Sequence, residues 1–448
     1  MMGYHTAIPV HRAAFWRCVM AVAHPIVLIP GIKGTKLVET NRVSHDIIFS
    51  GVQMHYESVM DLELTPVFNR SHFDRRPDTI IHPGELESVA YGSFVDEASQ
   101  DAIVFIFNYD WRLSLAENGK RLRAFLEYLA NKGKAINKAL KVEKKQERVD
   151  FSSFNIVTHS MGNFIARNYL KHWGFELVEK VVFVAPPFRG ALSLAQVVVT
   201  GQGMFSTKQK IRKIIRTFPG ALELMPHKPG YQTASRFDDG SGHDFFNADH
   251  WQSNVNDQRK DWGRKFRSTL ESAGSAVAGE LAELSDFGAE ERRRMLVIAR
   301  HGADTLQAVT VRKNTPAVSN FLDFKRACHN AFGDEQVAHA SSCAFWESVQ
   351  TLMVTDKTGF FNALSGLFTW EQLLGPHAMV MADDRVQTLV LDFFDADRPF
   401  EFRVPGDTVR PVVGLDVKRC EDAAEGHVYW VPKVGDAEDG EVLLEQDE

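Results

Sequence analysis

The chain has 448 residues, of which 44% are hydrophobic and 24% charged, as is ordinary for a folded soluble protein. This length allows one large domain with insertions, or two to three domains. The net charge of −7 argues against nucleic acid as a partner, and much of it lies in residues 418–448, which hold 10 Asp/Glu and 3 Lys/Arg. We therefore expect a frayed acidic tail on a nearly neutral protein.

The ends and the cysteines indicate a cytoplasmic protein. No apolar run is long enough to cross a membrane, and the first residues lack a signal-peptide core, because His11, Arg12 and Arg17 interrupt them. Met20 is an alternative start to Met1. The four cysteines form no C-x-x-C pair, which argues against zinc and dense disulfides, although one Cys328–Cys343 bridge stays open. We expect no metal and no cofactor, and the oligomeric state stays open.

The first predicted element is a buried strand that begins near His24 and runs into the Gly-rich turn Pro30–Lys36. Gly31 and Gly34 allow the backbone to approach a ligand closely. In a serine hydrolase, the loop after an early strand supplies one backbone N–H to the oxyanion hole, and we assign that donor to Ile32. A plain strand–loop junction is the alternative interpretation.

Residues 40–98 show no clear periodicity and contain Pro66, Pro77 and Pro83. We interpret them as an irregular insertion over the sheet. Its apolar residues are compatible with transient contact with a lipid surface, although core packing explains most such residues.

A second buried strand at 101–109 ends in the polar block Tyr109-Asp110-Trp111-Arg112. Polar residues at a strand end often belong to a site, but a structural salt bridge between Asp110 and Arg112 is the favoured interpretation here. An amphipathic helix is predicted from Leu115 to about Lys141, followed by a solvated charged connection to Arg148.

Residues 151–173 show a strand, a sharp turn that carries Ser160, and then apolar residues at helical spacing. This is the context of a nucleophile elbow, in which the backbone N–H of Met161 faces an oxyanion formed on a substrate attacked by Ser160. Thr158 stands where the consensus has glycine, and we expect a β-branched residue there to crowd strand and helix. The competing interpretation is a serine that caps an ordinary helix.

Another strand at 178–185 completes the order strand, helix, strand, helix, strand, which predicts an α/β fold with a mostly parallel doubly wound sheet. Residues 191–290 break this rhythm and are predicted to form an inserted cap or lid. The expected units are an N-terminal extension at 1–23, core at 24–190, cap at 191–290, core at 291–398, and a small β-rich appendage with the acidic tail at 399–448.

A serine nucleophile needs a histidine base and a carboxylate that orients it. In α/β-hydrolases the chain order is serine, acid, histidine, and Ser160, Asp334 and His377 satisfy it. Asp304, at the end of the strand after the cap, is the alternative acid. Two further acidic residues near Asp334 are candidates, Asp323 and Glu335. The other candidate bases are His159, His301 and His339. Of these, His159 flanks the serine on the other side of the turn and is expected to be structural.

Several of these blocks together resemble the lecithin:cholesterol acyltransferase-like family of α/β-hydrolases. They are His24–Gly31, Asn108–Leu113, Thr158–Gly162, Gly333–Val337 with Ser341, and Pro376-His377 with Met379. The resemblance covers about residues 24–395 in short islands. It implies Ser160 as nucleophile, Asp334 rather than Asp304 as acid, His377 as base, and backbone donors at Ile32 and Met161.

The resemblance also implies a substrate class, an acyl ester that is lipid-like. The secreted relatives close their lipid-binding loop with a disulfide, and residues 40–98 contain no cysteine, so lipid-surface binding does not carry over. Three hypotheses follow. The chain is a serine esterase or lipase-like hydrolase, an O-acyltransferase that passes the acyl group to an alcohol, or a non-catalytic binding protein on a hydrolase fold, for which Thr158 and Glu335-Gln336 are the support.

Overall fold

A computed structural model describes sixteen stretches of the chain. They are residues 22–39, 46–49, 64–65, 70–71, 81–142, 149–201, 208–227, 235–237, 243–252, 255, 261–311, 322–330, 332–355, 375–395, 409–411 and 428–431. The N-terminal extension before residue 22 and the charged connection 143–148 lie outside these stretches.

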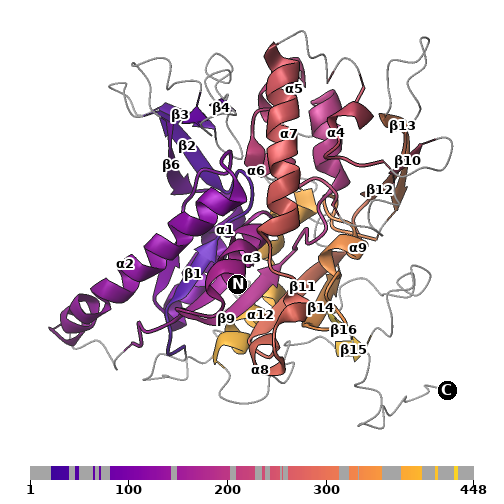
Figure 1. Ribbon diagram of the computed structural model, residues 1–448. Helices are drawn as coiled ribbons and strands as arrows, with labels where there is room; N and C mark the ends of the chain where they lie inside the picture. Colours follow the sequence, from indigo (N-terminus) through magenta and orange to yellow (C-terminus); the bar gives the residue numbers. More distant parts are fainter. Residues whose placement is uncertain are drawn as a thin grey trace, which may run out of the picture.

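The centre of the molecule is a sheet of eight strands in the order β15-β16-β14-β11-β9-β8-β1-β7 (Figure 1). The six strands from β14 to β7 are parallel, and β16 joins β14 in the antiparallel direction. The strands are β1 (Ile26–Ile29), β7 (Val104–Ile106), β8 (Phe154–His159), β9 (Val178–Val184), β11 (Met295–His301), β14 (Gln350–Thr355), β15 (Val409–Pro411) and β16 (Val428–Val431).

The strand order reverses its direction at β1, where Leu28 pairs with Ile106 of β7 on one side and with Val157 of β8 on the other. The chain adds β7 at one edge of β1 and then builds β8, β9, β11 and β14 outward from the other edge. This is the predicted doubly wound α/β arrangement. Ligands of such sheets bind at the carboxyl ends of strands next to the reversal, which here are β1 and β8.

Alternating residues of the strands pack on opposite faces of the sheet. Val27 and Ile29 belong to the core that also contains residues of α2 (Leu115–Val142) and α3 (Gly162–Trp173). Ile26 and Leu28 belong to a second core with residues of α1 (Ser88–Asp101) and α12 (Asp384–Asp395). Both faces of β1 are therefore buried, as expected of a parallel strand covered by helices on each side.

Between β9 and β11 the chain forms the group of elements predicted as a cap. Figure 1 shows the helices from α4 to α7 beyond one end of the sheet, at the top of the view, whereas α8 lies at the bottom. The elements are α4 (Leu192–Thr200), α5 (Lys208–Ile215), α6 (Pro219–Leu222), β10 (Ser235–Phe237), η4 (Ala248–His250), α7 (Asp261–Gly279), η5 (Leu284–Asp286) and α8 (Ala289–Arg292). Strand β10 pairs with β12 (Thr305–Val311), which forms an antiparallel pair with β13 (Leu322–Asn330).

The prediction of an irregular insertion is wrong for residues 81–98. They form β6 (Ile81–Leu86) and most of α1, whose buried residues Ala90, Tyr91, Phe94 and Ala98 face the sheet. Strand β6 pairs with β2 (Thr35–Glu39), which also pairs with β3 (Asp46–Phe49). Two short strands, β4 (Leu64–Thr65) and β5 (Arg70–Ser71), complete the described part of this region.

The described part of residues 399–448 extends the main sheet. Residues 351–354 of β14 pair with 428–431 of β16, and β15 follows at the edge. The small β appendage predicted from the sequence therefore adds its strands to the core sheet.

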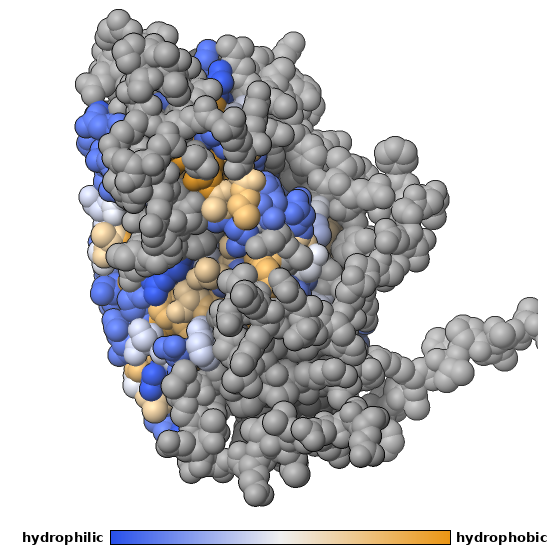
Figure 2. All heavy atoms as spheres, turned by 90° about the vertical axis from the view of Figure 1, so that its right-hand side faces the viewer, coloured by the Kyte–Doolittle hydropathy of each residue, from blue (hydrophilic) through white to orange (hydrophobic). Residues whose placement is uncertain are grey.

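The described surface carries little exposed apolar area. Among the residues that the structure describes, Tyr128 is the one large hydrophobic side chain that is exposed, at 57%. On the face shown in Figure 2, apolar residues come to the surface in separate groups with hydrophilic residues between them. No described helix is both long enough and apolar enough to span a membrane. Contact with a lipid surface stays a prediction.

Candidate active site

Ser160 occupies a strained turn between β8 and α3. Its φ is +50°, in the left-handed region that non-glycine residues rarely adopt, and its N–H donates to the Val184 carbonyl at 3.1 Å. The residue is 6% exposed. A strained serine between a buried strand and a helix is the geometry of a nucleophile elbow rather than that of a plain helix cap.

Three residues from distant parts of the chain meet at this turn. The Ser160 hydroxyl donates to Nε2 of His377 at 2.8 Å, and Nδ1 of His377 donates to Oδ2 of Asp334 at 2.7 Å. The other oxygen of Asp334 accepts from the backbone N–H groups of Gln336 at 3.1 Å and Val337 at 2.7 Å. The structure thus joins the predicted serine, histidine and acid in one buried chain of hydrogen bonds.

The short helical segment that carries His377, residues 375–378, is held at two consecutive carbonyl groups. Arg300 at the end of β11 donates from Nη1 to the Pro376 carbonyl at 2.9 Å, and Nε2 of His159 lies 3.1 Å from the His377 carbonyl. Because a carbonyl oxygen only accepts, Nε2 of His159 must carry the proton. Burial, assisted by the nearby charges of His377 and Arg300, lowers the pKa of His159 well below its usual value, so this ring is neutral.

His159 also connects to the turn Gly31–Gly34, which is predicted to hold the oxyanion and is called the oxyanion turn below. Its Nδ1 accepts from the Tyr91 hydroxyl at 2.7 Å, and the Tyr91 oxygen accepts from the Gly31 N–H at 2.8 Å. Tyr91 lies on α1, within the region for which the sequence predicted no regular structure. The expectation that His159 is structural agrees with these contacts, whereas Tyr91 and Arg300 were not predicted at all.

The predicted oxyanion donors Ile32 and Met161 lie on two turns in close contact. A Cβ built on Gly31 would lie 2.9 Å from Cβ of Ser160, and one on Gly162 would lie 2.4 Å from the Ile29 carbonyl oxygen. In the part of the chain that the structure describes, neither the Ile32 N–H nor the Met161 N–H donates a hydrogen bond. Both donors are therefore available to a substrate.

The block Tyr109–Arg112 holds the oxyanion turn from the other side. The Tyr109 hydroxyl donates to the Pro30 carbonyl at 2.8 Å, and Nε1 of Trp111 donates to the Thr35 carbonyl at 3.0 Å. Arg112 forms the expected ion pair with Asp110 at 2.6 Å, and both side chains are buried. The two polar residues thus support the backbone that presents Tyr109 and Trp111.

Asp304, His301 and His339 have side-chain partners outside the hydrogen-bond chain of Ser160, His377 and Asp334. The side chain of Asp304 is 78% exposed and pairs with His329 at 3.6 Å, and Asp323 lies on β13. His301 and His339 face one another, with 3.2 Å between Nδ1 and Nε2. Burial lowers the pKa of both rings, to about 3 for His339, so this pair is neutral.

Thr158 fits the elbow without the crowding expected from its branched side chain. It is fully buried, and its hydroxyl lies 2.7 Å from Oδ1 of Asn163 and 3.2 Å from the Val182 carbonyl oxygen, both of which can accept its proton. The amide nitrogen of Asn163 donates to the carbonyls of Ser160 at 2.7 Å and Val184 at 3.1 Å. A tight contact between helix and strand lies instead at Gly162, against the Ile29 carbonyl of β1.

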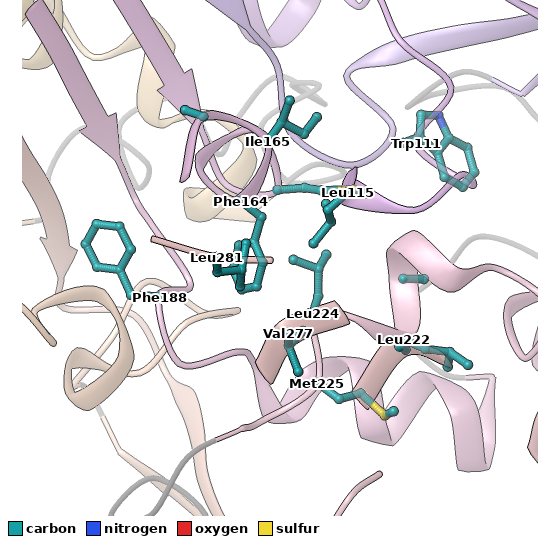
Figure 3. Packing of buried hydrophobic residues seen from close by; sticks show 14 of the residues in the cluster. Trp111, Leu115, Phe164, Ile165, Phe188, Leu222, Leu224, Met225, Val277 and Leu281 are labelled. Atoms are coloured by element: carbon teal, nitrogen blue, oxygen red, sulfur yellow. The ribbon is translucent and has the colours of Figure 1, made fainter. Parts of the chain in front are cut away.

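Cap residues pack directly on the elbow helix. Figure 3 shows Leu224 and Leu281 beside Phe164 of α3. A Cβ built on Gly220 of α6 would lie 2.7 Å from Cε of Met161. Glu223, next in the chain to α6, is buried and accepts from the N–H of Leu115, the first residue of α2, at 2.7 Å. The cap therefore contacts both the elbow and the helix that follows the Tyr109–Arg112 block.

Two of the expectations from the sequence concern metal ligands and cysteines. Within the described ranges, no group of three His, Cys, Asp or Glu residues is arranged to hold a metal ion. Cys328 is exposed and Cys343 is buried, and both are free thiols, so the bridge left open from the sequence is not formed.

Comparison with known proteins gives one family match. The family model described as Lecithin:cholesterol acyltransferase matches residues 98–266, a stretch that contains Ser160 and the Tyr109–Arg112 block but neither Asp334 nor His377. The match confirms the resemblance seen in the sequence motifs. No curated protein matches the chain.

Two solved structures are similar at low sequence identity. The crystal structure of the Tle4–Tli4 complex has 14% identity and a TM-score of 0.48, covering 83% of this chain and 97% of that chain. Phospholipase PlaB from Legionella pneumophila has 9% identity and a TM-score of 0.22, covering 84% of this chain and 62% of that chain.

Proposed function

We propose that this chain, which resembles the lecithin:cholesterol acyltransferase-like family, is a serine hydrolase that cleaves carboxylic esters of lipids through an acyl-enzyme on Ser160. The observation that carries the proposal is the unbroken hydrogen-bond chain from Ser160 through His377 to Asp334. The lipid character of the substrate is supported by the family match. An acyltransferase would use the same acyl-enzyme and differs only in its acceptor.

In the proposed mechanism His377 takes the Ser160 proton as the hydroxyl oxygen attacks the ester carbonyl carbon. Asp334 holds the imidazole with Nδ1 protonated and stabilises the imidazolium that forms. The negative charge on the carbonyl oxygen is received by the N–H groups of Ile32 and Met161. His377 then protonates the leaving alcohol, and water, activated by the same histidine, releases the acid and restores Ser160.

The hypothesis of a non-catalytic protein loses the features that supported it. Thr158 is hydrogen-bonded inside the elbow. Glu335 and Gln336 lie in the acid loop with their N–H groups bonded to Thr305 at 2.8 Å and to Asp334 at 3.1 Å. Both departures from the family pattern are thus accommodated around a complete triad.

The test is fluorophosphonate labelling, read by intact mass and peptide mapping, together with hydrolysis of soluble butyrate esters. We expect one label at Ser160, none in Ser160→Ala, and a rate reduced by about 10³- to 10⁴-fold in Asp334→Asn. Asp304→Asn is the matched control, because it removes an exposed carboxylate of the same type and should retain full rate. Retained labelling in Asp334→Asn with loss in Asp304→Asn would move the acid to the earlier strand.

The nature of the acceptor is decided by product analysis. Incubation with a lipid ester and an added alcohol or sterol should yield free fatty acid if water is the acceptor. A new ester as the main product would favour the acyltransferase. An unlabelled Ser160 in folded protein, with and without detergent, would contradict both enzymes.

A further inference from the structure

Lys33 lies in the oxyanion turn, and none of the residues that the structure describes supplies it with a counter-charge. It follows Ile32 directly and is partly buried. Within the described chain it has no hydrogen-bond or ion-pair partner. Lys36, three residues further on, instead pairs with Glu85 at 3.5 Å. A partly buried cation without a partner is costly, so its presence next to the site requires a reason.

The backbone at Lys33 adds to this cost. The Gly34 N–H donates to the Gly31 carbonyl at 3.0 Å, which closes a four-residue turn with Ile32 and Lys33 in the middle. Lys33 has a φ of +66°, and the third position of such a turn favours glycine. A side chain kept at a strained position beside a site is the pattern expected when that side chain is used there.

The electrostatics of the position favour an incoming anion. Burial lowers the pKa of Lys33 to about 8, because the ammonium group loses hydration. An anionic group placed beside it would supply the missing interaction and restore the charged form.

We propose that Lys33 binds an anionic group on the leaving alcohol of the substrate, namely the phosphodiester of a glycerophospholipid. The proposal rests on the proposed ester hydrolysis at Ser160. Adjacent Cα atoms are about 3.8 Å apart, so the lysine starts one residue from the Ile32 N–H that receives the ester oxygen. In a glycerophospholipid the phosphate is attached to the carbon next to one that carries an acyl ester, within reach of a four-carbon stem.

The experiment compares two soluble substrates with identical acyl groups, dibutyroyl phosphatidylcholine and the neutral 1,2-dibutyroylglycerol, both below their aggregation limits. For Lys33→Met we expect kcat/KM to fall about 10- to 100-fold on the phospholipid and to stay within about twofold on the neutral ester. Lys33→Arg keeps the charge and should retain most of the activity. Lys36→Met is the matched control and should change neither substrate.

Lys33→Gly separates binding from turn structure. Glycine relieves the strained backbone, so this variant should unfold at a higher temperature and still lose activity selectively on the phospholipid. An equal fall on both substrates in Lys33→Met, no fall on either, or wild-type protein that prefers the neutral ester would each overturn the role of Lys33. Those outcomes leave the ester hydrolase intact, whereas failure to hydrolyse either substrate and to label Ser160 would overturn the hydrolase itself.

Discussion

Gly162→Ala tests whether the oxyanion turn and the elbow are held in close contact. Gly162 has a negative φ, so alanine can adopt its backbone and only the available space is at issue. The new Cβ would lie 2.4 Å from the Ile29 carbonyl oxygen and 2.9 Å from that of Pro30. Ordinary contact begins near 3.4 Å, so the end of β1 and the start of α3 must move apart by about 1 Å.

This displacement should cost both stability and rate. Overpacking at a rigid backbone contact costs about 1–3 kcal/mol of folding free energy. A misplacement of about 1 Å between the donors and the nucleophile lowers the catalytic rate by about 100-fold. We therefore expect a lower urea midpoint and about 100-fold slower fluorophosphonate labelling of Ser160, with the label still confined to that serine.

Gly92→Ala is the control for Gly162→Ala, because it makes the same change where there is room. Gly92 lies inside α1, and the nearest atom to its added Cβ would be Cβ of Ser88 at 3.9 Å. Alanine favours helix over glycine by about 1 kcal/mol, so this variant should be slightly more stable and fully active. If Gly162→Ala matched it in stability and labelling rate, the close approach at the elbow would be refuted.

Two further predictions concern buried polar groups. Tyr91→Phe leaves the Gly31 N–H and Nδ1 of His159 without partners. We expect the free energy of unfolding in urea to fall by about 1–3 kcal/mol, and kcat to fall with little change in KM. Wild-type stability and wild-type kcat would contradict a positioning role for Tyr91. Burial, opposed by the hydrogen bond from the Leu115 N–H, raises the pKa of the Glu223 carboxyl from 4.5 to about 8. Between these pH values the folded state keeps a proton that the unfolded state releases. The free energy of unfolding should therefore fall as pH rises from about 4.5 to about 8. Glu223→Gln should remove this fall and be the more stable protein by up to a few kcal/mol when urea unfolding is compared at pH 5, 7 and 9. If the free energy of unfolding changed with pH in parallel for the two proteins, a buried neutral carboxyl would be contradicted.

Local patterns predicted the parts of the site that are built locally. The elbow is one continuous stretch in which strand, turn and helix each have their own signal, so Ser160 and Met161 could be named from it. Asp334 lies on a loop and His377 on a short helical segment far along the chain, and both were named from chain order and resemblance. Their mutual distances depend on how β11, β14 and α12 pack, which periodicity does not describe.

The contacts missed from the sequence are long-range. Tyr91 is on a helix whose buried residues are spaced helically, but Gly92 and Ser93 weaken the pattern, and nothing local relates it to Gly31, 60 residues away. The expected crowding at Thr158 was wrong for a similar reason. The consensus glycine suggested crowding at position 158, whereas the Thr158 hydroxyl is hydrogen-bonded there and a tight contact lies between Gly162 and the Ile29 carbonyl of β1.

The oxyanion turn and the segment that carries His377 are positioned by polar side chains from elements that are not neighbours in sequence. Tyr91 bonds the oxyanion turn, His159 bonds the His377 segment, and the two side chains bond each other, while Arg300 holds the same segment from β11. The Gly31 N–H can only donate and the His377 carbonyl can only accept, so with a neutral His159 one proton arrangement remains for Tyr91 and His159. A buried network with a single proton arrangement is rigid, and rigidity is what a site needs when its backbone donors must already face the charge that develops on the substrate.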